Sequence, residues 1–234
     1  MKAVILAGGS GSRLYPLTRK TAKCMLPVNG KPLLEHIIRY LASYGFKEII
    51  VTVGKRKEQI IDYFSDGSEF NVKLVYSVES KPLGTAGSFK NAERYLIGTT
   101  LIMQGDNLTN FNLKNVIEFH RKRKAMVTIA LTKVKDPSGY GIAVIDREGR
   151  IIRFEEKPSR FFSKLVNSGI YVVEHEVLDH IPKGIMFDFS RDLFPKLLKS
   201  KLPVYGIQLK GYWFDIGTTS SYRKANRYLK NLER

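Results

Sequence analysis

The strongest constraint on the fold is an alternation between short apolar runs and longer amphipathic segments. The first run, residues 2–6, is almost continuously apolar, which is typical of a strand buried on both faces of a parallel sheet. Residues 32–45 then place leucines and isoleucines at helical spacing, with Pro32 near the first turn and Gly45 beyond the last. Strand, loop and helix therefore form the first unit of a wound sheet.

The same unit repeats along the first half of the chain. We expect further strands at 48–53, 72–78 and 99–104, and helices at 58–64 and 86–96. Strands that alternate with helices have crossover connections, so this region predicts parallel pairing.

After residue 125 the pattern changes toward antiparallel pairing. We expect strands at 126–132, 142–146, 151–155, 166–173 and 204–209, and helices at 176–180, 191–199 and 219–232. Residues 147–149 form a short glycine-containing loop between two of the strands, as in a hairpin. The order of these elements predicts a mixed α/β fold with Rossmann-like winding. Because the sequence has no linker, repeat or low-complexity tract, we expect one domain, residues 1–234.

Cysteine content and hydropathy indicate the compartment. The single cysteine, Cys24, has no second cysteine with which to form a disulfide or a zinc motif, which indicates a reducing environment. No apolar run is long enough for a signal-peptide core or a membrane span. We therefore expect a cytoplasmic protein that does not associate with membranes.

The net charge points to an anionic partner. Lysine and arginine number 39 against 22 acidic residues, a formal charge of +17. Solvated surface lysines, nucleic-acid binding, a membrane surface and phosphorylated small molecules all fit such an excess. The basic residues are spread along the chain without a recognition-helix, RNP or zinc-finger pattern, so we do not expect a nucleic-acid partner.

A glycine-rich turn follows the first strand. Residues 7–14 read Ala-Gly-Gly-Ser-Gly-Ser-Arg-Leu. Glycines let backbone N–H groups face a phosphate, and the Arg13 guanidinium adds a planar set of donors. The turn lacks the third spaced glycine of the dinucleotide fingerprint, where Leu14 stands, and the Gly-Lys-Ser/Thr of the P-loop. An ordinary tight turn is the alternative interpretation.

Motifs along nearly the whole chain give this turn a context. The opening one runs from Leu6 through Gly8, Gly9, Gly11 and Arg13 to Lys23 and Leu26-Pro27-Val28. Others follow at 82–87, 105–106, 140–141, 154–158, 167–171 and 211–217. Their order resembles that of the nucleoside-diphosphate-sugar pyrophosphorylases, or sugar-1-phosphate nucleotidylyltransferases, and looks closest to mannose-1-phosphate guanylyltransferase catalytic domains.

The resemblance implies a glycosyltransferase-A-like nucleotidyltransferase domain. Its expected reaction joins a nucleoside triphosphate to a sugar 1-phosphate and releases pyrophosphate. Arg13 and Lys23 match the residues that hold the triphosphate and help pyrophosphate to leave, and Asp106 and Asp215 match two ligands of Mg²⁺. A sugar phosphate is already ionised at neutral pH, so no general base is needed. The four histidines form no catalytic motif, and we expect them at the surface.

The resemblance also implies the substrate contacts. The nucleotide positions are Leu6, Gly8, Gly9, Gly11, Glu79, Gly84 and Thr85, and the sugar-phosphate positions are Gly141, Glu156, Lys157 and Asn167. The chain departs from the family pattern at Ser12, where threonine is usual, and at Thr21-Ala22, where a proline often precedes the lysine. Many relatives continue into a left-handed β-helix, whereas we expect this chain to hold only the transferase module. Homo-oligomerisation stays open.

Glu79 bears on the choice of base, because pyrimidine-using relatives generally carry glutamine there. An ionised carboxylate only accepts hydrogen bonds, which suits the N1–H and N2–H₂ donors of guanine. We therefore expect GTP. The spacing between the motifs at 154–158 and 167–169 resembles that of mannose-1-phosphate guanylyltransferases, and this resemblance implies mannose 1-phosphate as the sugar. The alternatives are a glucose-1-phosphate thymidylyl- or uridylyltransferase, a manno-heptose-1-phosphate guanylyltransferase, and a catalytically silent regulatory subunit. The intact charged residues argue against the last.

Overall fold

A computed structural model describes residues 1–9 and 11–232, so Ser10 of the glycine-rich turn lies outside the described residues. The chain divides into two compact units, each built from separate segments. The N-terminal unit comprises Lys2–Pro82, Met103–Asn110 and Tyr212–Arg234. The central unit comprises Met1, Leu83–Ile102 and Phe111–Gly211. The expectation of one domain stays a prediction.

The N-terminal unit has the expected parallel ladder. Strand β4 (Glu48–Val53) pairs in parallel with β1 (Lys2–Leu6) and with β5 (Lys73–Val78). Helix α1 (Leu33–Ser43) lies between β1 and β4 along the chain, and α2 (Lys57–Phe64) lies between β4 and β5. The apolar face of α1 is buried, as its helical spacing predicts.

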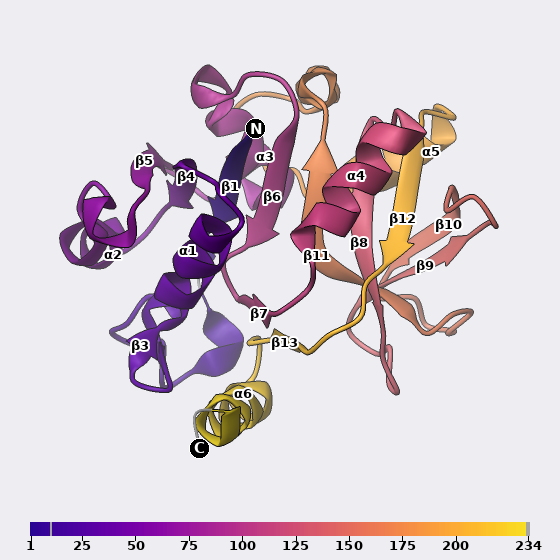
Figure 1. The fold of residues 1–234 in the computed structure, drawn as a ribbon. Helices are drawn as coiled ribbons and strands as arrows, with labels where there is room; N and C mark the ends of the chain where they lie inside the picture. The colour runs from indigo at the N-terminus through magenta and orange to yellow at the C-terminus, as the bar shows by residue number, and fades with distance from the viewer. Residues whose placement is uncertain (10, 233–234) are drawn as a thin grey trace. The chain divides into compact units, whose positions relative to one another are not determined.

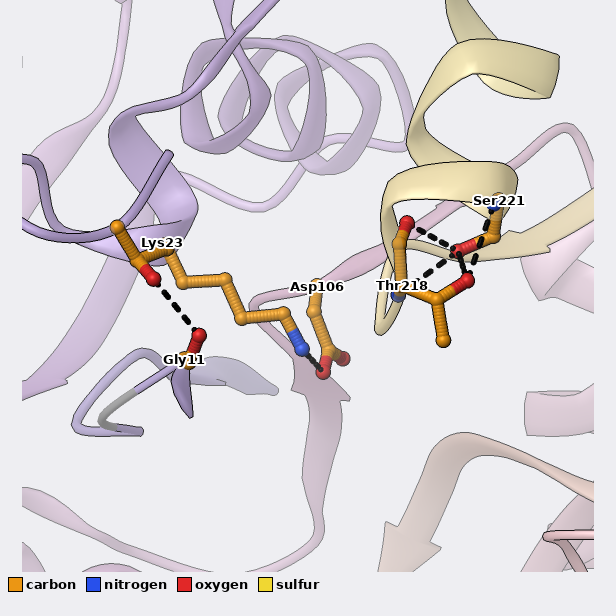
Figure 2. Close-up of polar contacts among 6 residues, drawn as sticks. Gly11, Lys23, Asp106, Thr218 and Ser221 are labelled. Carbon is orange, nitrogen blue, oxygen red and sulfur yellow. Dashed lines mark hydrogen bonds and ion pairs between the residues drawn. The ribbon is translucent and has the colours of Figure 1, made fainter. Parts of the chain in front are cut away.

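Short elements that local patterns do not predict complete this unit. Two of them, β7 (Asn107–Thr109) and β13 (Trp213–Asp215), pair as an antiparallel ribbon. Another two, β2 (Pro27–Val28) and β3 (Lys31–Pro32), form a small hairpin. Helix α6 (Thr219–Leu232) follows β13, and Figure 1 shows it near the C-terminus. Thr218 Oγ1 accepts a hydrogen bond from Ser221 N at 3.1 Å and caps the start of α6 (Figure 2).

The central unit contains the antiparallel part of the fold. Its strands are β8 (Val127–Lys133), β9 (Gly141–Ile145), β10 (Ile151–Glu156), β11 (Leu165–Val173) and β12 (Val204–Gln208). Strand β11 pairs antiparallel with β8 and β9, β9 and β10 form the predicted hairpin, and β12 runs parallel to β8. Helix α4 (Leu113–Arg123) lies across β8 and β12 (Figure 1). Strand β6 (Thr100–Gln104) contributes residues to both units.

Three helices of the central unit differ from the predicted ones. The expected helix at 86–96 is α3 (Gly84–Asn91) followed by a 3₁₀ turn, Glu93–Tyr95. The expected helix at 176–180 is a 3₁₀ helix, His175–His180. At 191–199 a π-helical turn, Phe189–Leu193, precedes α5 (Phe194–Lys199). Pro195 explains this last boundary, because a residue without an N–H fits the first turn of a helix and not its interior.

The core of the central unit corrects the expectation that all histidines lie at the surface. His120 is only 1% exposed, with Nδ1 2.9 Å from Thr128 Oγ1 and Nε2 3.0 Å from Glu174 Oε1. It follows Leu113 and Val116 at helical spacing and so lies on the buried face of α4. Burial lowers the pKa of the imidazole and so favours its neutral form, although the hydrogen bond to Glu174 opposes this shift.

Among the described residues, no helix is both long and apolar enough to cross a bilayer.

Candidate functional site

The ribbon of the N-terminal unit brings two distant aspartates together. Asp106 directly precedes β7, and Asp215 ends β13 opposite Asn107. The Ile216 N–H donates to the Asp106 carbonyl at 2.9 Å. The Gly105 N–H donates to the Leu6 carbonyl at 2.9 Å, so Asp106 also lies beside the carboxyl end of β1. This is the edge at which wound sheets bind ligands.

Lys23 and Asp106 form a close ion pair. Lys23 Nζ lies 2.5 Å from Asp106 Oδ2, and Figure 2 shows the lysine extended toward the carboxylate. The second oxygen, Asp106 Oδ1, is buried and accepts no hydrogen bond from any described residue. An unsatisfied carboxylate oxygen is costly in a protein interior, so a cationic partner at Asp106 Oδ1 would stabilise the site.

These residues line a cavity of about 250 Å³. Its lining comprises Leu6, Ala7, Gly9, Gly11, Ser12, Arg13, Lys23, Cys24, Gly105, Asp106 and Gly217. Gly11 has φ +68°, and a Cβ there would lie 2.9 Å from Thr18 Cγ2 and 3.0 Å from Lys23 Cβ. Burial raises the pKa of the Cys24 thiol to about 12, so this lining group is uncharged at neutral pH. The charge of the lining therefore comes from Arg13, Lys23 and Asp106.

Two glycines beside the aspartates line the cavity, and the sequence motifs at 105–106 and 211–217 contain them although we assigned them no role. A Cβ on Gly217 would lie 3.2 Å from Asp215 Oδ1 and 3.4 Å from Arg13 Nη2. A Cβ on Gly105 would lie 2.9 Å from the Leu6 carbonyl oxygen. Each glycine stands within two residues of a predicted metal ligand and inside the same motif, and this was the signal that could have identified it.

Glu79 lies at the same edge of the N-terminal unit. Its N–H donates to the Val53 carbonyl at 2.8 Å, which extends the β4–β5 ladder beyond β5. A Cβ on Gly8 would lie 3.0 Å from Glu79 Oε1. The carboxylate of Glu79 therefore rests against the backbone of the glycine-rich turn.

The central unit gathers three of the predicted sugar-phosphate residues. A Cβ on Gly141 would lie 2.7 Å from Glu156 Oε2, so this carboxylate occupies the space that a side chain would fill. Lys157 Nζ lies 3.9 Å from Glu156 Oε1. Lys157 has φ +50°, and its N–H donates to the Tyr140 carbonyl at 3.1 Å. Burial raises the pKa of Glu156, and the charges of Lys157 and Arg191 oppose this shift.

The polar groups of Thr85 and Asn167 have partners within the central unit. The N–H and the hydroxyl of Thr85 both bond to Asp188 Oδ1, at 3.1 and 3.0 Å. Asn167 Nδ2 donates to Tyr171 Oη at 2.9 Å and to Ser190 Oγ at 3.0 Å. Gly84 has φ +71°, and a Cβ there would lie 2.8 Å from the Phe187 carbonyl oxygen. These residues support the segment 187–190, and their substrate contacts stay predictions.

The donor set is compatible with Mg²⁺ bound jointly by protein and substrate. Within the part of the chain that the structure describes, no group of three or more histidine, cysteine, aspartate or glutamate side chains is arranged to hold a metal ion by itself. Mg²⁺ is usually held by one or two carboxylates together with substrate phosphates and water. Asp106 and Asp215, with the orphaned Oδ1 of Asp106, fit this mode.

Sequence comparison gives the site a family context. Residues 2–231 match the family described as Nucleotidyl transferase. A UTP–glucose-1-phosphate uridylyltransferase of Synechocystis is 37% identical over 254 residues, covering 100% of this chain and 66% of that protein. A mannose-1-phosphate guanylyltransferase of Mycobacterium tuberculosis is 36% identical over 226 residues, covering 96% of this chain and 63% of that protein. The chain spans less than two thirds of the length of these relatives.

Solved structures agree on the architecture. A structure described as a putative glucose-1-phosphate thymidylyltransferase from Bacillus anthracis, in complex with a sucrose, matches with a TM-score of 0.90 and 29% identity over 99% of this chain and 96% of that one. HddC from Yersinia pseudotuberculosis, complexed with GMP-PN, matches with a TM-score of 0.84 and 30% identity over 97% and 99%. The predicted mixed α/β fold of nucleotidyltransferase type is confirmed.

Proposed function

Because the chain belongs to the nucleotidyl transferase family, we propose that it joins a nucleoside triphosphate to a sugar 1-phosphate and releases pyrophosphate. The observation that carries this proposal is the cavity in which Arg13, Lys23 and Asp106 meet the glycine-rich turn. A triphosphate can approach glycine backbone closely, and the two cations offset its charge.

The reaction requires positioned charge and no general base. The sugar phosphate has a second pKa of about 6, so its oxygen is largely ionised at neutral pH. That oxygen attacks the α-phosphorus, and the bond between this phosphorus and the oxygen that leads to the β-phosphate breaks. Two polyanions repel one another, so the catalyst must neutralise them while holding them in line. We assign the triphosphate and the departing pyrophosphate to Arg13 and Lys23.

We assign the metal to Asp106 and Asp215. When bound, Mg²⁺ would supply positive charge to the phosphate oxygens. The carboxylate of Asp106 offers Oδ1 to the metal while Oδ2 stays paired with Lys23. The adjacent backbone of β7 and β13 would keep the two aspartates at a constant separation.

The central unit supplies groups that suit a sugar phosphate. Lys157 is 43% exposed, which suits an ammonium that meets a phosphate arriving from solvent. The Glu156 carboxylate is largely buried and lies against Gly141, which suits a group that accepts hydrogen bonds from sugar hydroxyls. We therefore assign the sugar 1-phosphate to these two residues.

For the base we propose guanine and for the sugar mannose. The contact of the Glu79 carboxylate with Gly8 supports this choice, because two acceptor oxygens complement the two donors of the guanine edge. The second candidate is a uridylyl- or thymidylyltransferase acting on glucose 1-phosphate, which the names of the Synechocystis relative and the Bacillus anthracis structure favour. The lone, buried cysteine suits a cytoplasmic setting for either reaction.

A substrate matrix tests the proposal. Purified protein with Mg²⁺ is assayed for pyrophosphate release with ATP, GTP, CTP, UTP and dTTP, each against the 1-phosphates of glucose, mannose, manno-heptose and N-acetylglucosamine. We expect the highest kcat/KM for GTP with mannose 1-phosphate. Asp106→Asn protein, prepared identically, supplies the background. A wild type that stays at this background with every pair would reject nucleotidyl transfer and leave the regulatory-subunit alternative.

A further inference from the structure

A side chain of α2 holds the segment that leads into Lys23. Gln59 Oε1 accepts a hydrogen bond from Ala22 N at 2.9 Å, and Gln59 Nε2 donates to the Lys20 carbonyl at 2.7 Å. One primary amide thus uses both its acceptor and its donor on backbone groups two residues apart. Next to it, Arg56 Nη2 donates to the Arg19 carbonyl at 2.7 Å. Residues 19–22 are therefore fixed to α2.

This anchorage passes directly to Lys23. The Ala22 N–H donates the hydrogen bond to Gln59. The carbonyl of the same residue accepts a hydrogen bond from the Met25 N–H at 2.9 Å. That second bond closes the 3₁₀ turn Lys23–Met25, which carries the lysine. Lys23 Nζ then reaches Asp106 at 2.5 Å (Figure 2). Only the backbone of Ala22 and the side chain of Lys23 therefore separate Gln59 from the ion pair with Asp106.

We propose that Gln59 is a positioning residue, which sets the backbone at Ala22 so that the Lys23 ammonium is held against Asp106. A lysine side chain has four rotatable bonds, so the place of its backbone decides which group the ammonium meets. Misplacement of a reacting group by about 1 Å can cost about 100-fold in rate. The consequence for catalysis rests on the proposed function, whereas the effect on the position of Lys23 does not.

The kinetic test uses two replacements of the amide. Gln59→Leu removes both hydrogen bonds, and Gln59→Glu keeps the acceptor but sets a carboxylate oxygen against the Lys20 carbonyl. We expect Gln59→Leu to lower kcat by about 10-fold or more while the KM for the sugar phosphate changes by less than about 2-fold, with Gln59→Glu between it and the wild type. Glu58→Gln is the matched control, because the neighbouring side chain is 68% exposed. Wild-type kcat in Gln59→Leu would overturn the proposal.

A second measurement needs no substrate. Lys23 is 13% exposed and paired, so it should react slowly with an amine-acylating ester, as followed by peptide mass spectrometry. Gln59→Leu should raise the labelling rate of Lys23 by about 5-fold or more and leave exposed Lys164 unchanged, with a similar Tm. Unchanged labelling of Lys23 in a folded variant would reject the positioning role. If the wild type transfers no nucleotide but this difference appears, the proposed function fails and the positioning role stands.

Discussion

Each unit of the molecule holds a lysine beside a carboxylate, and the two pairs differ in how closely they engage. In the N-terminal unit, Lys23 and Asp106 lie 2.5 Å apart with side chains 13% and 21% exposed. In the central unit, Lys157 and Glu156 are 3.9 Å apart, and burial raises the pKa of the glutamate. A close pair defines a geometry before any ligand arrives, whereas a loose pair leaves both groups available to a ligand.

The backbone at Lys157 supports this distinction. A lysine at φ +50° lies in a region that residues other than glycine seldom adopt, and such residues gather at functional sites. Lys23 instead lies in an ordinary 3₁₀ turn that Gln59 supports from outside. We therefore expect changes in the first pair to affect turnover most, and changes in the second to affect substrate affinity and stability.

The largest expected effect comes from removing the charge of the close pair. Asp106→Asn keeps an oxygen that accepts from Lys23 but loses its charge, and we expect pyrophosphate release to fall by about 1,000-fold or more. Asp215→Asn should act similarly, because both are assigned to one metal. The assay is a Mg²⁺ titration of the rate, with exposed Asp62→Asn as the control. A folded variant of either kind with a near wild-type rate at limiting Mg²⁺ would contradict the shared metal site.

The next effect tests whether the loose pair acts on affinity. Lys157→Ala should raise the KM for the sugar phosphate by about 10- to 100-fold, since a charge-assisted hydrogen bond contributes about 1.5–3 kcal/mol. Arg13→Ala, in the N-terminal unit, should mainly lower kcat, because its charge meets the departing pyrophosphate. Steady-state kinetics separate the two, and Lys164→Ala serves as the surface control. If both variants lost kcat equally and kept the wild-type KM, the proposed division between substrate affinity and turnover would be wrong.

A smaller effect concerns the base. Glu79→Gln turns one of two acceptors into a donor, so kcat/KM with GTP should fall by about 10-fold while that with UTP or dTTP rises. The measurement is the ratio of kcat/KM values for three triphosphates at a constant sugar phosphate concentration. If the variant kept the same ranking of bases, or if the wild type already preferred UTP or dTTP, Glu79 would not select guanine.

The smallest effect is a pH-dependent change in stability. Because burial raises the pKa of Glu156, the folded state favours its protonated form, and the ionised form destabilises the fold at neutral pH. Glu156→Gln should therefore have a higher Tm than the wild type at pH 7. The difference should shrink as the pH falls through the raised pKa toward the usual value of about 4.3. Calorimetry across pH 4–8 measures the Tm of both proteins. A Tm difference that is independent of pH would show that burial does not raise the pKa of Glu156.

Regular elements of this protein follow from local sequence. The bounds predicted for β4 and α6 are those observed. Strand β4 is a mostly β-branched segment of strand length, and α6 has a long amphipathic pattern with helical periodicity. The order of the motifs likewise identified the family, since each motif is short and readable without the fold. Three charged residues that the motifs nominated, Arg13, Lys23 and Asp106, line one cavity.

Tertiary structure decided how polar groups from distant segments come together. Strands β7 and β13 have three residues each, too few for a periodic signal, yet their pairing brings Asp106 beside Asp215. Gln59 reads as an ordinary polar residue of an amphipathic helix, and nothing in its spacing indicates that its amide holds Ala22. Spacing along the chain encodes which face of an element is apolar. The contacts of a polar side chain depend instead on segments that are remote in sequence, and only the folded chain brings those together.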